Sequence, residues 1–270
     1  MPETREWGDP ELEGPLAFLG GPYNNHIALR AALEDARRRG ASRVFCLGDL
    51  GGFGPNPGKI YPLLDEYGVV AIAGNYDISL AERLADCGCG YTHPSDNEFA
   101  QRSYEYTSRR TTDAERRWLG SLPRAARFRR GGRRWHLCHG SPRRVNEFLW
   151  ESASSDAFLA RLARDAEADV VLCSHTGIPW QRTLPAGSRF VNVGAIGRPA
   201  NDGRPEVWYA LVPPGEETAR FIPVAYDHDA LAREMEAEGL PPEFIETIRS
   251  GWWTTCLEIL PAKERAKGRY

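Results

Sequence analysis

Short apolar runs alternate with longer amphipathic segments along much of this chain. The apolar runs have the length of buried β-strands; they cover residues 15–20, 43–48, 69–74, 169–175, 189–195, 206–212 and 219–226. Segments 26–40 and 59–68 lie between the first three runs and carry apolar residues at helical spacing. A hairpin with Gly131 and Gly132 at its turn is expected between the third run, at 69–74, and the fourth, at 169–175. This alternation predicts an α/β fold with a parallel or mixed sheet covered by helices.

The chain contains no internal repeat, low-complexity tract or clear linker, so a single domain over 1–270 is expected. After the third apolar run the pattern loosens, and residues 86–123 are interpreted as an insertion over the strand ends. Residues 1–14 are expected to be flexible, and residues 251–270 form a C-terminal tail. The tail contains two adjacent tryptophans and Cys256, which dock it onto the body or form a lid or subunit contact.

Composition narrows the classes of function. With 270 residues and 41% hydrophobic content the chain can bury a core of ordinary size. A formal net charge of −3 provides no basic field for nucleic acid, so no nucleic-acid partner is expected. The chain has no long apolar span and its N-terminus is acidic, so we expect a cytoplasmic protein without a membrane partner. Cys46, Cys138 and Cys173 lie within apolar runs, and a disulfide framework is not expected.

Polar residues follow four of the apolar runs at the point where each strand should end. They are Asp49, Asn75, His139 and His175. Ligand sites of open α/β folds form outside the carboxyl ends of the strands, so these side chains are expected to converge. Each ending alone is more often a turn or a packed residue, but together they form a mixed oxygen and nitrogen set suited to Mn, Fe, Zn or Ni.

The order and spacing of these endings resemble those of the calcineurin-like metallophosphoesterases. The sequences GDLGGFGPNP at 48–57, HGSPRR at 139–144 and VNVGAIGRPANDG at 191–203 are similar to motifs of a bacterial branch of that family. The resemblance extends over approximately residues 15–250. It implies a four-layer αββα sandwich of two mixed sheets flanked by helices, and a metal-dependent phosphoesterase with a centre for two ions.

The departures from the family pattern fall on one of the two metals. Gly21, Tyr23 and Gly177 stand where the family has an aspartate and two histidines that bind the first metal. The resemblance assigns Asp49, Asn75, His139 and His175 to the second metal, and this chain keeps all four. We therefore expect one divalent transition-metal ion. Two ions remain the alternative if the lost ligands are replaced, and the candidate replacements are Tyr23, His26, Cys87, Cys89 and His93.

The resemblance also suggests residues for the remaining chemistry. Tyr76 stands where the family has a histidine that protonates the leaving group, and its phenol is a candidate substitute beside Asn75. Asp77 is expected to orient the residue that follows Asn75. Four residues in or beside the motif loops are candidates for holding phosphate, although surface charge explains the arginines equally well: Asn24, Asn25, Arg143 and Arg198.

Three functions remain open on these observations. The first is an enzyme that hydrolyses a phosphomonoester or phosphodiester of a small metabolite or nucleotide. The second is a catalytically weak or inactive protein that binds a small phosphorylated ligand in the same pocket. The third is a remodelled metal site that uses cysteine, histidine or tyrosine ligands. The sequence leaves the oligomeric state open, with a homo-oligomer as one option.

Overall fold

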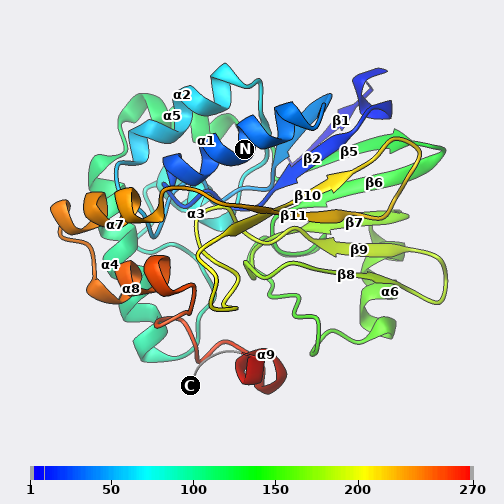
Figure 1. Cartoon of the computed structure of the whole chain (residues 1–270). Coiled ribbons are helices and arrows are strands. Elements are labelled where there is room, and N and C mark those ends of the chain that lie inside the picture. Colours follow the sequence, from blue (N-terminus) through cyan, green and yellow to red (C-terminus); the bar gives the residue numbers. More distant parts are fainter. Residues whose placement is uncertain (1–2, 9, 268–270) are drawn as a thin grey trace.

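Two mixed β-sheets pack face to face in the computed structural model, which describes residues 3–8 and 10–267 (Figure 1). The six-stranded sheet has the order β1-β5-β6-β7-β9-β8, and the five-stranded sheet has the order β11-β10-β2-β3-β4. The strands of the first sheet are β1 (Thr4–Trp7), β5 (Ala125–Arg130), β6 (Arg133–Cys138), β7 (Val170–Cys173), β9 (Arg189–Asn192) and β8 (Trp180–Thr183). Those of the second are β11 (Arg220–Val224), β10 (Val207–Val212), β2 (Leu16–Leu19), β3 (Arg43–Cys46) and β4 (Val70–Ala71).

The pairing within each sheet combines parallel and antiparallel neighbours. Strands β2, β3 and β4 run parallel, whereas β10 is antiparallel to both β2 and β11. In the other sheet β6, β7 and β9 are parallel, and the predicted hairpin joins β5 to β6. Because β3 and β4 are parallel, as are β6 and β7, the carboxyl ends of each pair lie on one edge of their sheet.

A layer of aromatic side chains fills the space between the sheets. Phe18 stacks on Phe45 within one sheet, with ring centroids 5.4 Å apart, and Phe128 stacks on Trp135 within the other at 5.6 Å. Phe45 also stacks on Phe128 across the interface, with centroids 5.6 Å apart. Each such pair contributes roughly 0.5–1.5 kcal/mol beyond the burial of its area. This shared core fixes the two sheets against each other.

Helices cover the two outer faces. Helix α1 begins after Asn25, whose side chain accepts from the Ala28 N–H, and it buries an alanine and leucine stripe against the five-stranded sheet. Helix α6 covers the six-stranded sheet with Leu159 and Leu162. The helices are α1 (His26–Arg38), α2 (Ile60–Glu66), α3 (Asn75–Glu82), α4 (Pro94–Arg110), α5 (Asp113–Ser121), α6 (Asp156–Asp165), α7 (His228–Ala237), α8 (Pro242–Ser250) and α9 (Ala262–Lys267). The predicted αββα sandwich is confirmed.

Part of the segment 1–14, for which the sequence predicts flexibility, has regular secondary structure. Residues 4–7 form β1, which pairs in parallel with β5, and Leu12 is buried in the core between the sheets. The apolar run that signals a strand is absent here, because β1 is an edge strand whose side chains are mostly exposed. Residues 1, 2 and 9 lie outside the described part. Among the described residues no helix has the length and apolarity needed to cross a membrane.

Candidate metal centre

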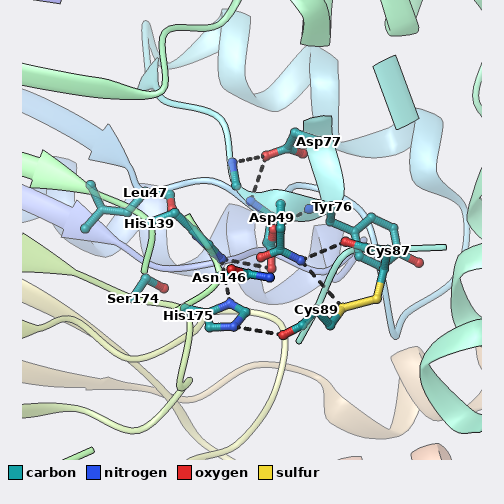
Figure 2. A network of polar contacts seen from close by, with 12 residues as sticks. Leu47, Asp49, Tyr76, Asp77, Cys87, Cys89, His139, Asn146, Ser174 and His175 are labelled. Atoms are coloured by element: carbon teal, nitrogen blue, oxygen red, sulfur yellow. Dashed lines mark hydrogen bonds and ion pairs between the residues drawn. A yellow bond between two sulfur atoms is a disulfide. The ribbon is translucent and has the colours of Figure 1, made fainter. Parts of the chain in front are cut away.

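Three of the four expected metal ligands meet at the carboxyl ends of the strands. Asp49 follows β3, His139 directly follows β6 and His175 follows β7 (Figure 2). Their ligand atoms all lie within 4.8 Å of one another, and all three residues are buried. The two sheets each contribute to this cluster, so the packing of the aromatic core determines its geometry. Figure 2 shows both imidazole rings beside the Asp49 carboxylate.

Hydrogen bonds from the protein backbone fix the tautomers of the two histidines. His139 Nδ1 is 2.6 Å from the Leu47 carbonyl oxygen, and His175 Nε2 is 3.2 Å from the Cys89 carbonyl oxygen. A carbonyl oxygen only accepts, so the nitrogen that faces it carries the hydrogen. The opposite nitrogens therefore present lone pairs. This is the arrangement in which a histidine is usually held when it binds a metal.

The free lone pairs point at one another. His139 Nε2 lies 3.1 Å from Asp49 Oδ2 and 3.0 Å from His175 Nδ1. With both histidines neutral these three atoms are acceptors with no donor between them. A single shared cation, either a proton or a metal ion, satisfies all three at once. These oxygen and nitrogen ligand atoms therefore fit a divalent transition metal.

Asn75 keeps a buried acceptor atom that no donor in the protein satisfies. It is the first residue of α3, and its Nδ2 donates to the Cys87 carbonyl oxygen at 2.9 Å. Its Oδ1 is buried and has no hydrogen-bond partner. A buried polar atom without a partner costs about 1–3 kcal/mol, and such atoms are uncommon. The Asn75 amide is thus oriented by its nitrogen and keeps its oxygen free.

The pKa values of the cluster favour a neutral His175 beside an ionised Asp49. Burial and then the neighbouring His139 lower the pKa of His175 to about 3, so its ring is neutral at ordinary pH. Burial alone would raise the pKa of Asp49, but the adjacent His139 lowers it below the usual range. Burial would lower the pKa of His139, but the Asp49 carboxylate raises it. A proton on His139 therefore competes with a metal ion for this position.

Asp77 holds the loop that presents Asp49. Its carboxylate accepts from the backbone N–H groups of Gly74 at 2.8 Å, Asp49 at 2.8 Å and Leu50 at 3.0 Å. Asp49 has a φ of +55°, a left-handed conformation that non-glycine residues seldom adopt. Burial and then the Asp49 carboxylate raise the pKa of Asp77 to about 7. In Figure 2 Asp77 points away from the two histidine rings, so it positions the loop.

Aromatic rings lie beside Gly21 and Gly177, two of the positions at which the family has ligands of the first metal. A Cβ atom at Gly21 would lie 2.3 Å from Cε1 of Tyr23, because the tyrosine ring lies against this backbone. Gly177 has a φ of +72°, and a Cβ atom there would meet the ring of Trp253 at 3.7 Å. A Cβ atom would therefore clash at Gly21, whereas at Gly177 it would make an ordinary contact and only the backbone conformation is unfavourable. As packed, position 21 has no space for the carboxylate that the resemblance places there.

Tyr76 is at the site, but its phenol is a weak acid. The hydroxyl lies 3.3 Å from Ser103 Oγ, and the ring packs edge-on against Tyr104. Burial raises the pKa of Tyr76 well above its usual range. This change opposes the expected transfer of a proton to a leaving group. The contact of Tyr76 with the metal cluster is instead through its backbone, whose N–H donates to Asp49 Oδ1 at 3.0 Å.

The candidate replacement ligands do not join the cluster. Cys87 and Cys89 form a single local disulfide, a pairing that was not predicted from the sequence, and neither residue therefore offers a thiolate to a metal. Gly88 between them has a φ of +60°, which brings the two Cα atoms to 5.3 Å. His93 caps α4 and its Nδ1 lies 2.7 Å from Ser95 Oγ. His26 lies 3.5 Å from Glu234 on α7.

Tyr23 also lies at the site, and it is poorly suited to bind a metal. Its ring lines the same cavity as Asp49 and His175. Burial and then the nearby Asp49 carboxylate raise its pKa well above the usual range, so the phenol keeps its proton. A metal ligand requires the phenolate form. Tyr23 therefore fills space beside the cluster.

Of the four phosphate candidates, only Arg198 lines the cavity at the cluster. Asn25 caps α1, and Asn24 Nδ2 donates to the Gly54 carbonyl oxygen at 3.0 Å and to Thr107 Oγ1 at 3.1 Å. Arg143 is exposed and pairs with Glu147 through Nε at 2.9 Å. Three of these side chains are therefore already engaged in contacts that stabilise their own loops or helix. A position beside a motif in the sequence does not show whether a side chain contacts its own loop or is free to bind a ligand.

Several residues of the site carry no signal in the sequence. The Leu47 and Cys89 carbonyl oxygens orient the histidines, and any residue type provides a carbonyl. Phe148 packs on the His175 ring with centroids 4.3 Å apart. The tail contributes Trp253, which the adjacent tryptophans of the sequence could have indicated, because docking of such a pair on the body was one of the expected options.

Comparison with known proteins agrees with this architecture. A model described as the calcineurin-like phosphoesterase superfamily domain matches residues 24–213. An uncharacterized protein from Methanocaldococcus jannaschii is 23% identical over 246 residues, which cover 85% of this chain and 95% of that protein.

Two solved structures share the fold. A hypothetical protein from Pyrococcus horikoshii has a TM-score of 0.75 and 23% identity, covering 89% of this chain and 99% of its own. A metallophosphoesterase from Sphaerobacter thermophilus has a TM-score of 0.68 and 24% identity, covering 88% of this chain and 99% of its own. These structural matches therefore extend across most of the chain.

Proposed function

Because this chain belongs to the calcineurin-like phosphoesterase superfamily, we propose that it is a metal-dependent phosphoesterase whose centre holds one divalent transition-metal ion. Asp49, Asn75, His139 and His175 would hold the ion. The observation that carries the proposal is the convergence of three buried ligand atoms: His139 Nε2 lies 3.1 Å from Asp49 Oδ2 and 3.0 Å from His175 Nδ1. The unpartnered Oδ1 of Asn75 supports it independently.

The centre holds a single ion in this proposal because the space for further ligands is filled. Tyr23 packs over Gly21 and leaves no room there for a carboxylate, and the φ of +72° at Gly177 disfavours any residue with a side chain at that position. The disulfide removes Cys87 and Cys89 as thiolate ligands. Mn, Fe, Zn and Ni all suit the remaining oxygen and nitrogen donors.

A bound ion of this kind acts as a Lewis acid toward a phosphoryl oxygen of the substrate. The surrounding residues of the chain orient the metal ligands and exclude water from them. Asp77 holds the Asp49 loop, the two backbone carbonyls hold the imidazole rings, and Phe148 shields His175 from water. The phenol of Tyr76 is too weak an acid to assist departure of a basic alcohol. The preferred substrates are therefore small phosphomonoesters or phosphodiesters, of a metabolite or nucleotide, that have good leaving groups.

The direct test is hydrolysis by protein stripped with a chelator and reloaded with Mn, Ni, Zn or Fe. We expect turnover of 4-nitrophenyl phosphate or bis(4-nitrophenyl) phosphate with at least one ion, and one ion per chain by elemental analysis. His139→Ala and Asp49→Asn should abolish activity. His93→Ala is the matched control, because His93 caps a helix and is outside the cluster. Activity retained in His139→Ala would refute the proposal.

The buried Tyr76 phenol favours one competing function, the binding of a phosphorylated ligand without turnover. The same pocket would then hold the ligand while no group protonates a leaving oxygen. The two functions separate in one experiment. If no metal supports turnover of either aryl ester, while a phosphorylated metabolite raises the melting temperature of the metal-loaded chain, the binding function replaces the enzyme.

A further inference from the structure

Arg198 lies in the cavity that contains the metal cluster, beyond the end of β9. The cavity has a volume of about 90 Å³ and is lined by Asp49, His175 and Tyr23 as well as by Arg198. One water needs roughly 10–15 Å³ by this kind of measure, so the space accommodates several waters or a group of phosphoryl size. The Arg198 residue is 8% exposed. Its guanidinium is therefore a buried positive charge beside the cluster.

Among the described residues, no carboxylate lies within 4.0 Å of this guanidinium. Arg198 makes one hydrogen bond, from a terminal nitrogen to the Thr255 carbonyl oxygen at 2.6 Å, and its Nε is buried without a partner. Cys256 is near, but burial raises the pKa of its thiol and keeps it neutral. An unpaired buried ion costs several kcal/mol. A guanidinium left in this state has unused donors for an anion.

Stacking holds the guanidinium in place. Its Cζ lies 3.8 Å from the ring centroid of Trp253 and 5.3 Å from that of Phe53. These contacts stabilise the cation and restrict its rotation, so little freedom remains to be lost when an anion binds. A planar fork of donors fixed in this way suits the bidentate recognition of a phosphoryl group.

We infer that Arg198 forms a phosphoryl-anion site that binds without the metal, adjacent to the Asp49, His139 and His175 cluster. The inference rests on the proposed function only for the identity of the anion. In the substrate complex the guanidinium binds phosphoryl oxygens from the side of Tyr23 and Trp253. Arg198 then contributes to substrate affinity, while the metal ligands are required for turnover.

The test is titration of inorganic phosphate into the full chain after chelation of metal, followed by calorimetry. We expect measurable binding by the wild type, weakening of at least tenfold in Arg198→Met, and partial retention in Arg198→Lys. Arg143→Met is the matched control, because that arginine is exposed and paired with Glu147. Equal affinity of Arg198→Met and the wild type would overturn the inference, as would the absence of phosphate binding by the wild type.

A second measurement avoids dependence on a variant that fails to fold. In the wild-type chain labelled with ¹⁵N-arginine, added phosphate should shift the Arg198 Nε–H resonance, and an unchanged resonance would overturn the inference. The outcomes also separate the two proposals. Phosphate binding without turnover under any metal sinks the enzyme and leaves the Arg198 site. Metal-dependent hydrolysis with KM unchanged in Arg198→Met sinks the Arg198 site and leaves the enzyme.

Discussion

Replacement of Gly21 by alanine tests whether the Tyr23 ring excludes a first-metal ligand. The new Cβ atom would lie 2.3, 2.8 and 2.9 Å from three atoms of that ring, closer than carbon atoms approach in proteins. The Tyr23 backbone is held in place, because its carbonyl oxygen accepts from the Gly54 N–H at 2.9 Å, so the backbone cannot shift freely to relieve the clash. Overpacking of this kind costs about 1–3 kcal/mol. For a chain of roughly this size that lowers the melting temperature by roughly 2–12 °C.

The assay is thermal unfolding in a chelator, so that metal binding does not contribute. Gly21→Ala/Tyr23→Ala should be more stable than the sum of the two single changes predicts, by about 1–3 kcal/mol, because removing the ring removes the clash. Gly21→Ala/Tyr23→Phe is the control, since the ring stays and no relief is expected. The reasoning is refuted if Gly21→Ala melts like the wild type, or if the phenylalanine pair gives the same relief as the alanine pair.

Three further predictions concern stability and the ligand loop. Chelation should lower the melting temperature, and restoring Mn or Zn at about 100 times Kd should return about 2.7 kcal/mol; this gain should be absent in His139→Ala, and two ions per wild-type chain would contradict the single-ion centre. Burial and the charge of Arg127 lower the pKa of His136 to about 4 in the folded state. The unfolded chain therefore binds more protons between about pH 6.5 and 4, so stability should fall by on the order of 3 kcal/mol as pH is lowered through that range. Urea unfolding of His136→Phe should show a smaller loss, and an identical pH slope would contradict the assignment. Asp77→Ala should destabilise the chain by more than 2 kcal/mol, on the order of the cost of several unpaired N–H groups, and weaken metal binding measured by calorimetry; unchanged metal affinity would exclude a positioning effect.

The fold and the position of the cluster can be predicted from the sequence, because the local hydrophobic pattern agrees with the tertiary structure. Buried strands produce continuous apolar runs, and parallel strands bring their carboxyl ends to one edge, so Asp49, His139 and His175 converge as expected. The edge strand β1 escaped detection because its side chains are mostly exposed. Strand β8 likewise has only one fully buried side chain, Trp180. An element that buries little leaves little pattern.

The fate of the remaining candidates depended on contacts between distant parts of the chain. Asn24 and Arg143 are polar loop residues of the right kind, but their side chains are engaged by Gly54, Thr107 and Glu147. The pairing of Cys87 with Cys89 depends on the left-handed conformation of Gly88. Sequence spacing indicates which residues are near a site. It does not indicate which of their atoms are already used.

In the proposed centre, the residues near the lost first metal keep the total charge that the family pattern has there. In the family pattern, the first metal comes with its own aspartate, so losing both removes one net positive charge from the centre. In the proposed centre a guanidinium at Arg198 returns that charge, and its stacked neighbour Trp253 covers the position of the lost histidine at Gly177. A fixed side chain cannot be removed by a chelator. Affinity for a phosphoryl anion should therefore survive chelation, whereas hydrolysis should not.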